Sequence, residues 1–209
     1  LMSGIEVHRP LILNVSSIFP NIVREELRNW GPGLKFFSDI YLYNILTAGK
    51  IINQLIPQQG YKFDLFAVHD WLSSITGLII KSNTNIPVVF HIHSTERGRT
   101  QGMGSSIVSD LEKNMANVAD KIITVSYAMK DELRMYSFPI EKVEVIYNGV
   151  DPEKYNPDTV DKEKVMGVRK QYNVDDDTNL ILFIGRLTFI KGVDKLVQAM
   201  PLVLRDFPK

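Results

Sequence analysis

The 209-residue sequence contains no cysteine, and this absence excludes disulfides, thiolate metal sites and a cysteine nucleophile. It also lacks any apolar run near the roughly 20 residues that a membrane-spanning helix needs, and its N-terminus shows no signal-peptide pattern. Basic and acidic residues balance at 24 each, so the basic surface typical of nucleic-acid binding is not indicated. We therefore expect a cytoplasmic protein with no membrane segment and no nucleic-acid partner. Nothing in the composition indicates an oligomeric state.

Short, nearly continuous apolar runs alternate along the chain with longer segments of helical periodicity. Such runs are typical of strands buried on both faces of a parallel sheet, and a repeated strand–helix–strand order predicts right-handed crossovers. The predicted strands are residues 11–15, 64–69, 86–93, 121–126, 143–147 and 180–185. The predicted helices are residues 38–56, 72–82, 107–119, 128–136 and 193–207. The expected fold class is α/β, with a doubly wound parallel sheet of the Rossmann-like kind.

Between residues 151 and 177, turn and helix-breaking residues interrupt the alternation of predicted strands and helices. Within this stretch we expect a short charged helix at 162–171. We expect a first domain at residues 1–151, a connection at 152–178, and the beginning of a second α/β domain at 179–209. A domain of about 30 residues cannot bury a core of its own. The chain is therefore expected to be an interior fragment of a larger protein, inactive alone; the family resemblance described below further implies that its opening strand is missing.

The segment from Gly185 to Gly192 carries two cations, Arg186 and Lys191, between a predicted strand and a predicted helix. Ligands of open α/β sheets bind beyond the carboxyl ends of the strands, where helix N-termini also point their N–H groups. A planar guanidinium and a compact ammonium both suit a diphosphate. The alternative is a surface loop with two solvated cations, and the spacing alone does not separate these interpretations.

The tripeptide His69-Asp70-Trp71 closes the predicted strand at 64–69. From a strand end, Trp71 can stack on a sugar and Asp70 can accept hydrogen bonds from hydroxyl groups. The alternative is that Asp70 caps the following helix and that Trp71 packs beneath it.

Two histidines, His91 and His93, lie two residues apart on the next predicted strand and therefore share a face. Such a pair can bind a metal, but no histidine follows His93, which argues against a metal site. His91 is then a core or supporting residue. The loop from Ser94 contains several glycines and is expected to be mobile, and we assign no catalytic role to its carboxylate, Glu96.

The last two strand ends of the first domain also carry small polar residues. Ser126 either lines a cleft or caps the following helix, and capping is the commoner role. Asn148-Gly149 is typical of a turn in which Gly149 supplies a dihedral angle that other residues avoid. The family resemblance described next implies that this turn forms a hinge and a cleft wall.

In this order, the motifs resemble the retaining glycosyltransferases of family 4, which include the glycogen and starch synthases. The resemblance runs from about Asp64 to the end of the chain. It implies a fold of two Rossmann-like domains with a cleft between them. It also implies roles for individual residues. Residues Arg186, Lys191 and Gly185 would bind the donor diphosphate; His93 and Asp70 would be catalytic, orienting the sugar; Trp71, Ser126, Asn148 and Gly149 would line the cleft.

The function implied by the resemblance is transfer of a hexose, with retention, from UDP- or ADP-glucose to a glucan or other sugar acceptor, with no cofactor and no metal. The family's Gly-rich first loop and its downstream Glu-x7-Glu element are not recognisable. The alternatives are another family 4 transferase (for sucrose, trehalose or cell-surface glycans), a nucleotide-sugar epimerase, or a non-catalytic carbohydrate- or nucleotide-binding fragment. A dinucleotide-dependent oxidoreductase is disfavoured, because no Gly-x-Gly-x-x-Gly follows an early strand.

Overall fold

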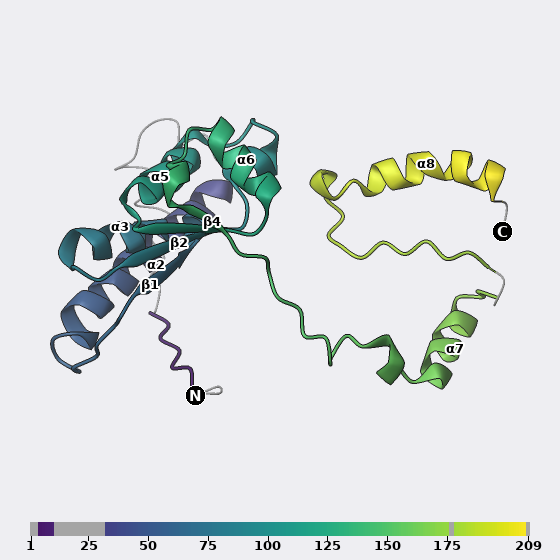
Figure 1. The fold of residues 1–209 in the computed structure, drawn as a ribbon, viewed down its shortest axis with the longest axis horizontal. Helices are drawn as coiled ribbons and strands as arrows, with labels where there is room; N and C mark the ends of the chain where they lie inside the picture. Colours follow the sequence, from purple (N-terminus) through teal and green to yellow (C-terminus); the bar gives the residue numbers. More distant parts are fainter. Residues whose placement is uncertain (1–3, 11–31, 176–177, 208–209) are drawn as a thin grey trace. The chain divides into compact units, whose positions relative to one another are not determined.

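The computed structural model describes residues 4–10, 32–175 and 178–207. The chain divides into two compact units, Leu1–Asn148 and Gly149–Lys209. Figure 1 shows both units, and each is described below by itself.

Among the residues that the structure describes, a parallel four-stranded sheet forms the centre of the first unit. Its strands follow the order β1-β2-β3-β4 and confirm the predicted parallel α/β class. Their bounds are β1 Phe66–His69, β2 Val88–Ile92, β3 Lys121–Thr124 and β4 Val143–Val145. Because this order is sequential, the described strands do not include the reversal of order that a doubly wound sheet requires. The strand predicted at residues 11–15 lies outside the described residues.

Helices connect and flank these strands, close to the predicted positions. Between β1 and β4 the helices are η3 Trp71–Ser73, α3 Ser74–Asn83, α4 Glu96–Thr100, α5 Ser106–Val118, α6 Tyr127–Met135 and η4 Ile140–Lys142. Ahead of β1, α2 Pro32–Lys50 continues into a π-helical turn, η2 Ile51–Leu55. Helix α3 packs against both α2 and α5, and α6 packs against β3 and β4.

The core of the first unit lies between the sheet and these helices. Phe90 and Ile122 are fully buried on neighbouring strands, and Met115 and Leu133 reach them from α5 and α6. Each such side chain stabilises the fold by about 1.5–3 kcal/mol through burial. Gly77 permits the close approach of α3, because a Cβ there would lie 2.6 Å from Met115 Sδ and 2.7 Å from a Val68 methyl.

A buried amide fixes α3, the helix that follows the His-Asp-Trp segment. Asn44 of α2 donates to the Leu72 carbonyl at 2.8 Å and accepts the Thr76 backbone N–H at 2.8 Å. Since an unpaired buried amide is costly, this pairing fixes the start of α3 relative to α2.

The described residues of the second unit form four helical segments. They are η5 Pro157–Thr159, α7 Lys162–Gln171, η6 Phe189–Lys191 and α8 Val193–Asp206. Helix α7 has the predicted bounds. The strand predicted at residues 180–185 is wrong for this structure, since these residues form no strand and Leu182 and Ile184 are 71% and 86% exposed. A strand needs a neighbour for its hydrogen-bond ladder, and none of the described residues provides one.

Candidate functional site

The carboxyl ends of β1 and β2 bring the His-Asp-Trp segment and the two-histidine segment together. In the sheet, His69 of β1 is the register partner of His91 of β2. Asp70 and His93 each lie just beyond this pair, at the edge where open α/β sheets bind ligands. The structure thus joins two of the predicted site residues, Asp70 and His93, through direct contacts.

Asp70 holds the turn that follows β2. Its backbone N–H donates to the His91 carbonyl at 2.9 Å, and its Oδ1 accepts the backbone N–H of His93 at 2.8 Å. Its φ of 49° is positive, which is unusual for a residue other than glycine. No side-chain capping bond to the following helix is made, so the helix-cap alternative for Asp70 is wrong, and its carboxylate binds the backbone that carries His93.

Three imidazole rings lie together at this edge. The Nδ1 of His69 is 3.1 Å from the Nε2 of His93, and the ring of His91 stacks on that of His69 with centroids 4.5 Å apart. Burial lowers the pKa of His91, and the neighbouring His69 and His93 lower it further because a second positive charge there is repelled. The lowered pKa favours the neutral form of the His91 imidazole.

Trp71 packs into a second, smaller core. Its ring stacks on Phe37 with centroids 6.1 Å apart and meets the edge of Phe36, and it is only 9% exposed. Trp71 therefore packs in the protein interior, as the second of the two interpretations of this residue predicts. Part of the same ring borders a hollow of about 420 Å³ that Glu96 and Ser105 also line, so Trp71 has both a core face and an open edge.

The segment after His93 was predicted to be a loop, but it forms the short helix α4 and is extensively hydrogen-bonded; its mobility stays a prediction. Arg99 donates to the Ser94 carbonyl at 3.0 Å and contacts Glu96 at 3.1 Å and Glu112 at 3.2 Å. Thr95 caps α4 by accepting the Gly98 backbone N–H at 2.9 Å. The physical reason is that a buried carboxylate, Glu112, provides a fixed point to which this loop binds.

Glu112 is the one strongly perturbed carboxyl group among the groups the structure describes. Burial raises its pKa to about 7, against the lowering effects of the Glu96 N–H and Arg99. Its side chain is 3% exposed. Glu112 lies on the inner face of α5, and its carboxylate faces away from solvent toward the first residue of α4.

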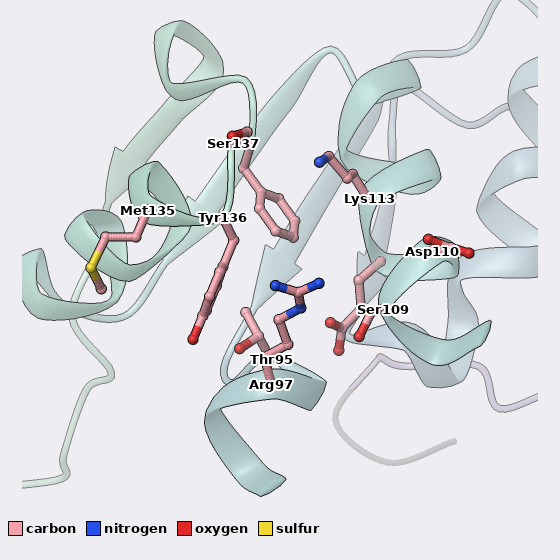
Figure 2. Close-up of a pocket in the computed structure, with 10 residues that line it drawn as sticks. Thr95, Arg97, Ser109, Asp110, Lys113, Met135, Tyr136 and Ser137 are labelled. Atoms are coloured by element: carbon pink, nitrogen blue, oxygen red, sulfur yellow. The ribbon is translucent and has the colours of Figure 1, made fainter. Parts of the chain in front are cut away.

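A polar hollow, which Glu112 also lines, lies between α4, α5 and the end of α6. Figure 2 shows Arg97 pointing into it, with Tyr136 on one side and Ser109 on the other. The hollow measures about 260 Å³, and the Arg97 guanidinium lies 5.1 Å from the centroid of the Tyr136 ring. Asp110 and Lys113 also line it, so both signs of charge are present and the lining selects no single class of ligand.

The remaining residues predicted in the first unit have simpler environments. Ser126 caps α6 by accepting the Met129 backbone N–H at 3.1 Å. Asn148 is exposed. The dihedral role expected for Gly149 is wrong, because its φ is not positive and a Cβ there would meet open space.

The predicted diphosphate loop lies in the second unit. Arg186 and Lys191 are both exposed, and within residues 178–207 neither makes an ion pair. The Thr188 backbone N–H donates to the Arg186 carbonyl at 2.8 Å, and Gly192, with φ 66°, begins α8 as expected. Gly185 has no positive φ; the described atom nearest to a Cβ built there belongs to the Phe183 ring, at 3.1 Å.

Two further site properties concern the described part of the chain. No group of three or more His, Cys, Asp or Glu side chains there is arranged to hold a metal ion. No helix among the same residues combines the length and the apolar character needed to cross a membrane.

Parallel strands with polar side chains at their carboxyl edge define an open α/β protein, a class whose ligands generally bind at that edge. The chain belongs to glycosyltransferase family 4, whose model, described as Glycosyltransferase Family 4, matches residues 15–154. It is 37% identical over 147 residues to an uncharacterized glycosyltransferase of Methanocaldococcus jannaschii, covering 68% of this chain and 37% of that protein. It is 26% identical over 169 residues to glycogen synthase of Mycobacterium tuberculosis, covering 78% and 38%.

A solved structure agrees with this assignment at the level of the fold. Sucrose-phosphate synthase from Thermosynechococcus elongatus superposes with a TM-score of 0.63 at 22% identity, over 79% of this chain and 39% of that protein. The chain thus spans less than half of the length of each of these three proteins.

Sequence reasoning missed two features of the site. One is the contact between His69 and His93, although both histidines were placed at the ends of strands. The other is the buried Glu112, whose signal was a carboxylate on the apolar face of the helix predicted at 107–119, one turn from Met115.

Proposed function

We propose that the full protein transfers a hexose, glucose in our assignment, from a nucleotide sugar to a glucan or other sugar acceptor, with retention of configuration. The observation that carries the proposal is His93, exposed at the carboxyl edge of the sheet and held there by Asp70, within a family 4 glycosyltransferase domain. The relative named glycogen synthase supports a glucan acceptor.

In this proposal the two units contribute different parts of the chemistry. Arg186 and Lys191 neutralise the negative charge that grows on the departing nucleoside diphosphate, which lowers the barrier by electrostatic stabilisation. His93 hydrogen-bonds a hydroxyl of the donor sugar. Asp70 acts on the sugar through His93, because its Oδ1 is already bound to the His93 backbone N–H. The donor is UDP- or ADP-glucose, and two side-chain cations take the place of a metal.

The proposal is tested by measuring sugar transfer with the protein as its gene encodes it. Radiolabelled UDP-glucose and ADP-glucose are supplied separately, with a maltooligosaccharide or without an acceptor, in the presence of EDTA. We expect label in the oligosaccharide with one donor, and an α-linked product by NMR. Binding of the oligosaccharide with no binding of either nucleotide by calorimetry would instead identify a non-catalytic carbohydrate-binding protein.

A further inference from the structure

We propose that His69 is a positioning residue for His93: its ring nitrogen fixes which nitrogen of His93 carries the proton that a substrate hydroxyl meets. The consequence for catalysis rests on the proposed function, whereas the hydrogen bond between the rings does not.

The main chain of His69 is anchored at the point where β1 ends. Its backbone N–H donates to the Ser73 hydroxyl oxygen at 2.8 Å, and the same hydroxyl donates to the His69 carbonyl at 2.8 Å. A short polar side chain in η3 therefore pairs with both backbone polar groups of His69, and it fixes the origin from which the His69 ring extends.

His93 is held by two successive residues of the same strand end. Its backbone N–H donates to Asp70 Oδ1 at 2.8 Å, and its ring Nε2 meets His69 Nδ1 at 3.1 Å. The Asp70 contact sets where the residue lies, and the His69 contact sets how its ring is turned. Two anchors of this kind hold a side chain more tightly than either alone, which is what orientation of a substrate requires.

The contact has a definite geometry. The facing nitrogens of His69 and His93 lie 3.1 Å apart while the ring centroids lie 5.4 Å apart, with the planes 14° from parallel. The two rings therefore meet edge to edge in nearly one plane, as a hydrogen bond requires. His91 differs, because its ring lies over that of His69 with centroids at 4.5 Å and provides packing.

Because of the chemistry of imidazole, the hydrogen bond between His69 and His93 determines which nitrogen of His93 carries the proton. A neutral imidazole has one N–H and one bare nitrogen, so one ring donates and the other accepts. Among the described contacts, the second nitrogen of His93, Nδ1, has no hydrogen-bond partner. When His69 Nδ1 donates, His93 must carry its own proton on Nδ1 and can donate it to a sugar hydroxyl; the reverse arrangement makes Nδ1 an acceptor.

A metal is not the reason for this cluster. The lone pairs of imidazole nitrogens lie in the ring planes, and the three planes are within 14–23° of parallel. The ring of His91 lies over that of His69, so the lone pairs of these two rings lie in separate, nearly parallel planes and do not meet at one point. Within the described residues, no group of three or more His, Cys, Asp or Glu side chains is arranged to hold a metal ion. The observed contact between His69 and His93 instead suits a hydrogen bond that orients the His93 ring.

The first test needs no activity. In the 209-residue chain, ¹⁵N chemical shifts of the imidazole nitrogens report the tautomer of His93. We expect one dominant tautomer in the unmodified chain and in His69→Asn, whose amide lies near the position of Nδ1. We expect a mixture in His69→Leu, which matches Asn in size, and in His69→Gln, whose amide lies too far out. His91→Leu is the control and should leave His93 unchanged. Equal tautomer populations in His69→Leu and the unmodified chain would overturn the proposal.

The second test uses sugar transfer by the gene-encoded protein. We expect His69→Leu and His69→Gln to lower kcat by about 10- to 100-fold with the donor KM changed by less than about threefold, and His69→Asn to restore most of kcat. A merely structural role would make Asn and Leu equally harmful. If the unmodified protein transfers no sugar, the proposed function fails, while the tautomer experiment still decides the role of His69.

Discussion

Both carboxylate oxygens of Glu112 accept the backbone N–H of Glu96, at 2.9 and 3.0 Å. This contact joins the middle of α5 to the first residue of α4. Because Arg99 also reaches Glu112, at 3.2 Å, the segment that follows His93 is fixed to a buried carboxylate of the core. The position of the candidate site thus depends on a group remote from it in sequence.

The perturbed pKa of Glu112 predicts a pH dependence of stability. In the unfolded chain the group ionises near its ordinary value of 4.5, whereas in the folded chain it keeps its proton up to about 7. A raised folded pKa stabilises fully below pH 4.5, and this contribution is lost as the pH rises through about 7. The shift corresponds to about 3 kcal/mol.

The measurement compares urea unfolding of the chain and of Glu112→Gln between pH 4.5 and 7.5. Gln keeps the shape and one acceptor oxygen but does not titrate. We expect the unfolding free energy of the unmodified chain to fall relative to that of Glu112→Gln by about 3 kcal/mol over this range. Parallel curves would show that the folded Glu112 titrates normally.

The turn after β2 should depend on the Asp70 carboxylate. Asp70→Ala leaves the His93 backbone N–H without its acceptor and places alanine at a positive φ, so we expect a loss of about 2 kcal/mol. Asp70→Asn keeps an acceptor oxygen, and asparagine tolerates positive φ better than most residues, so it should lose less than half as much.

The control for Asp70 is Asp110→Ala. Asp110 is exposed on α5, and removing it should change the unfolding free energy by less than about 0.5 kcal/mol. Equal stability of Asp70→Ala and Asp110→Ala in urea would contradict the role assigned to the Asp70 carboxylate.

Gly77 should tolerate no side chain. An alanine Cβ there would lie 2.7 Å from a branched Val68 methyl in the core, and overpacking of this kind costs about 1–3 kcal/mol. Gly49 is the matched control in α2, where a Cβ would come no closer than 3.9 Å to Asn53. Thermal unfolding should show a lower Tm for Gly77→Ala, and an equal or higher Tm for Gly49→Ala because alanine favours the helix.

Local sequence patterns predicted most elements of the fold because burial and capping leave local signals. The strands β1 to β4 appear as apolar runs, since a parallel sheet is covered on both faces. Helix α7 was predicted with its bounds from a short charged segment between turn residues, and the structure shows that Asp161 caps it. The prediction of a strand at 180–185 was wrong because a strand needs a neighbouring strand to pair with. An apolar run indicates burial, but it does not show that such a neighbour is present.

The sequence predicted where the residues of the candidate site lie, but it did not predict the contacts between them. Strand ends placed Asp70 and His93 at one edge of the sheet. Their hydrogen bond depends on the register of β1 and β2, which no local pattern specifies. The Arg186 and Lys191 assignments, and the domain bounds proposed from the sequence, stay predictions.

The most direct measurement of the central claim, nucleotide-sugar-dependent transfer, is the turnover of donor by the gene-encoded protein with Arg186→Ala and Lys191→Ala combined. Lys195→Ala is the control, since this exposed lysine of α8 pairs with its neighbour Asp194. Loss of two cations that stabilise the leaving diphosphate should lower kcat/KM for the nucleotide sugar by about 100- to 1,000-fold, while the control stays within about twofold. Unchanged donor turnover in the double variant would contradict the account.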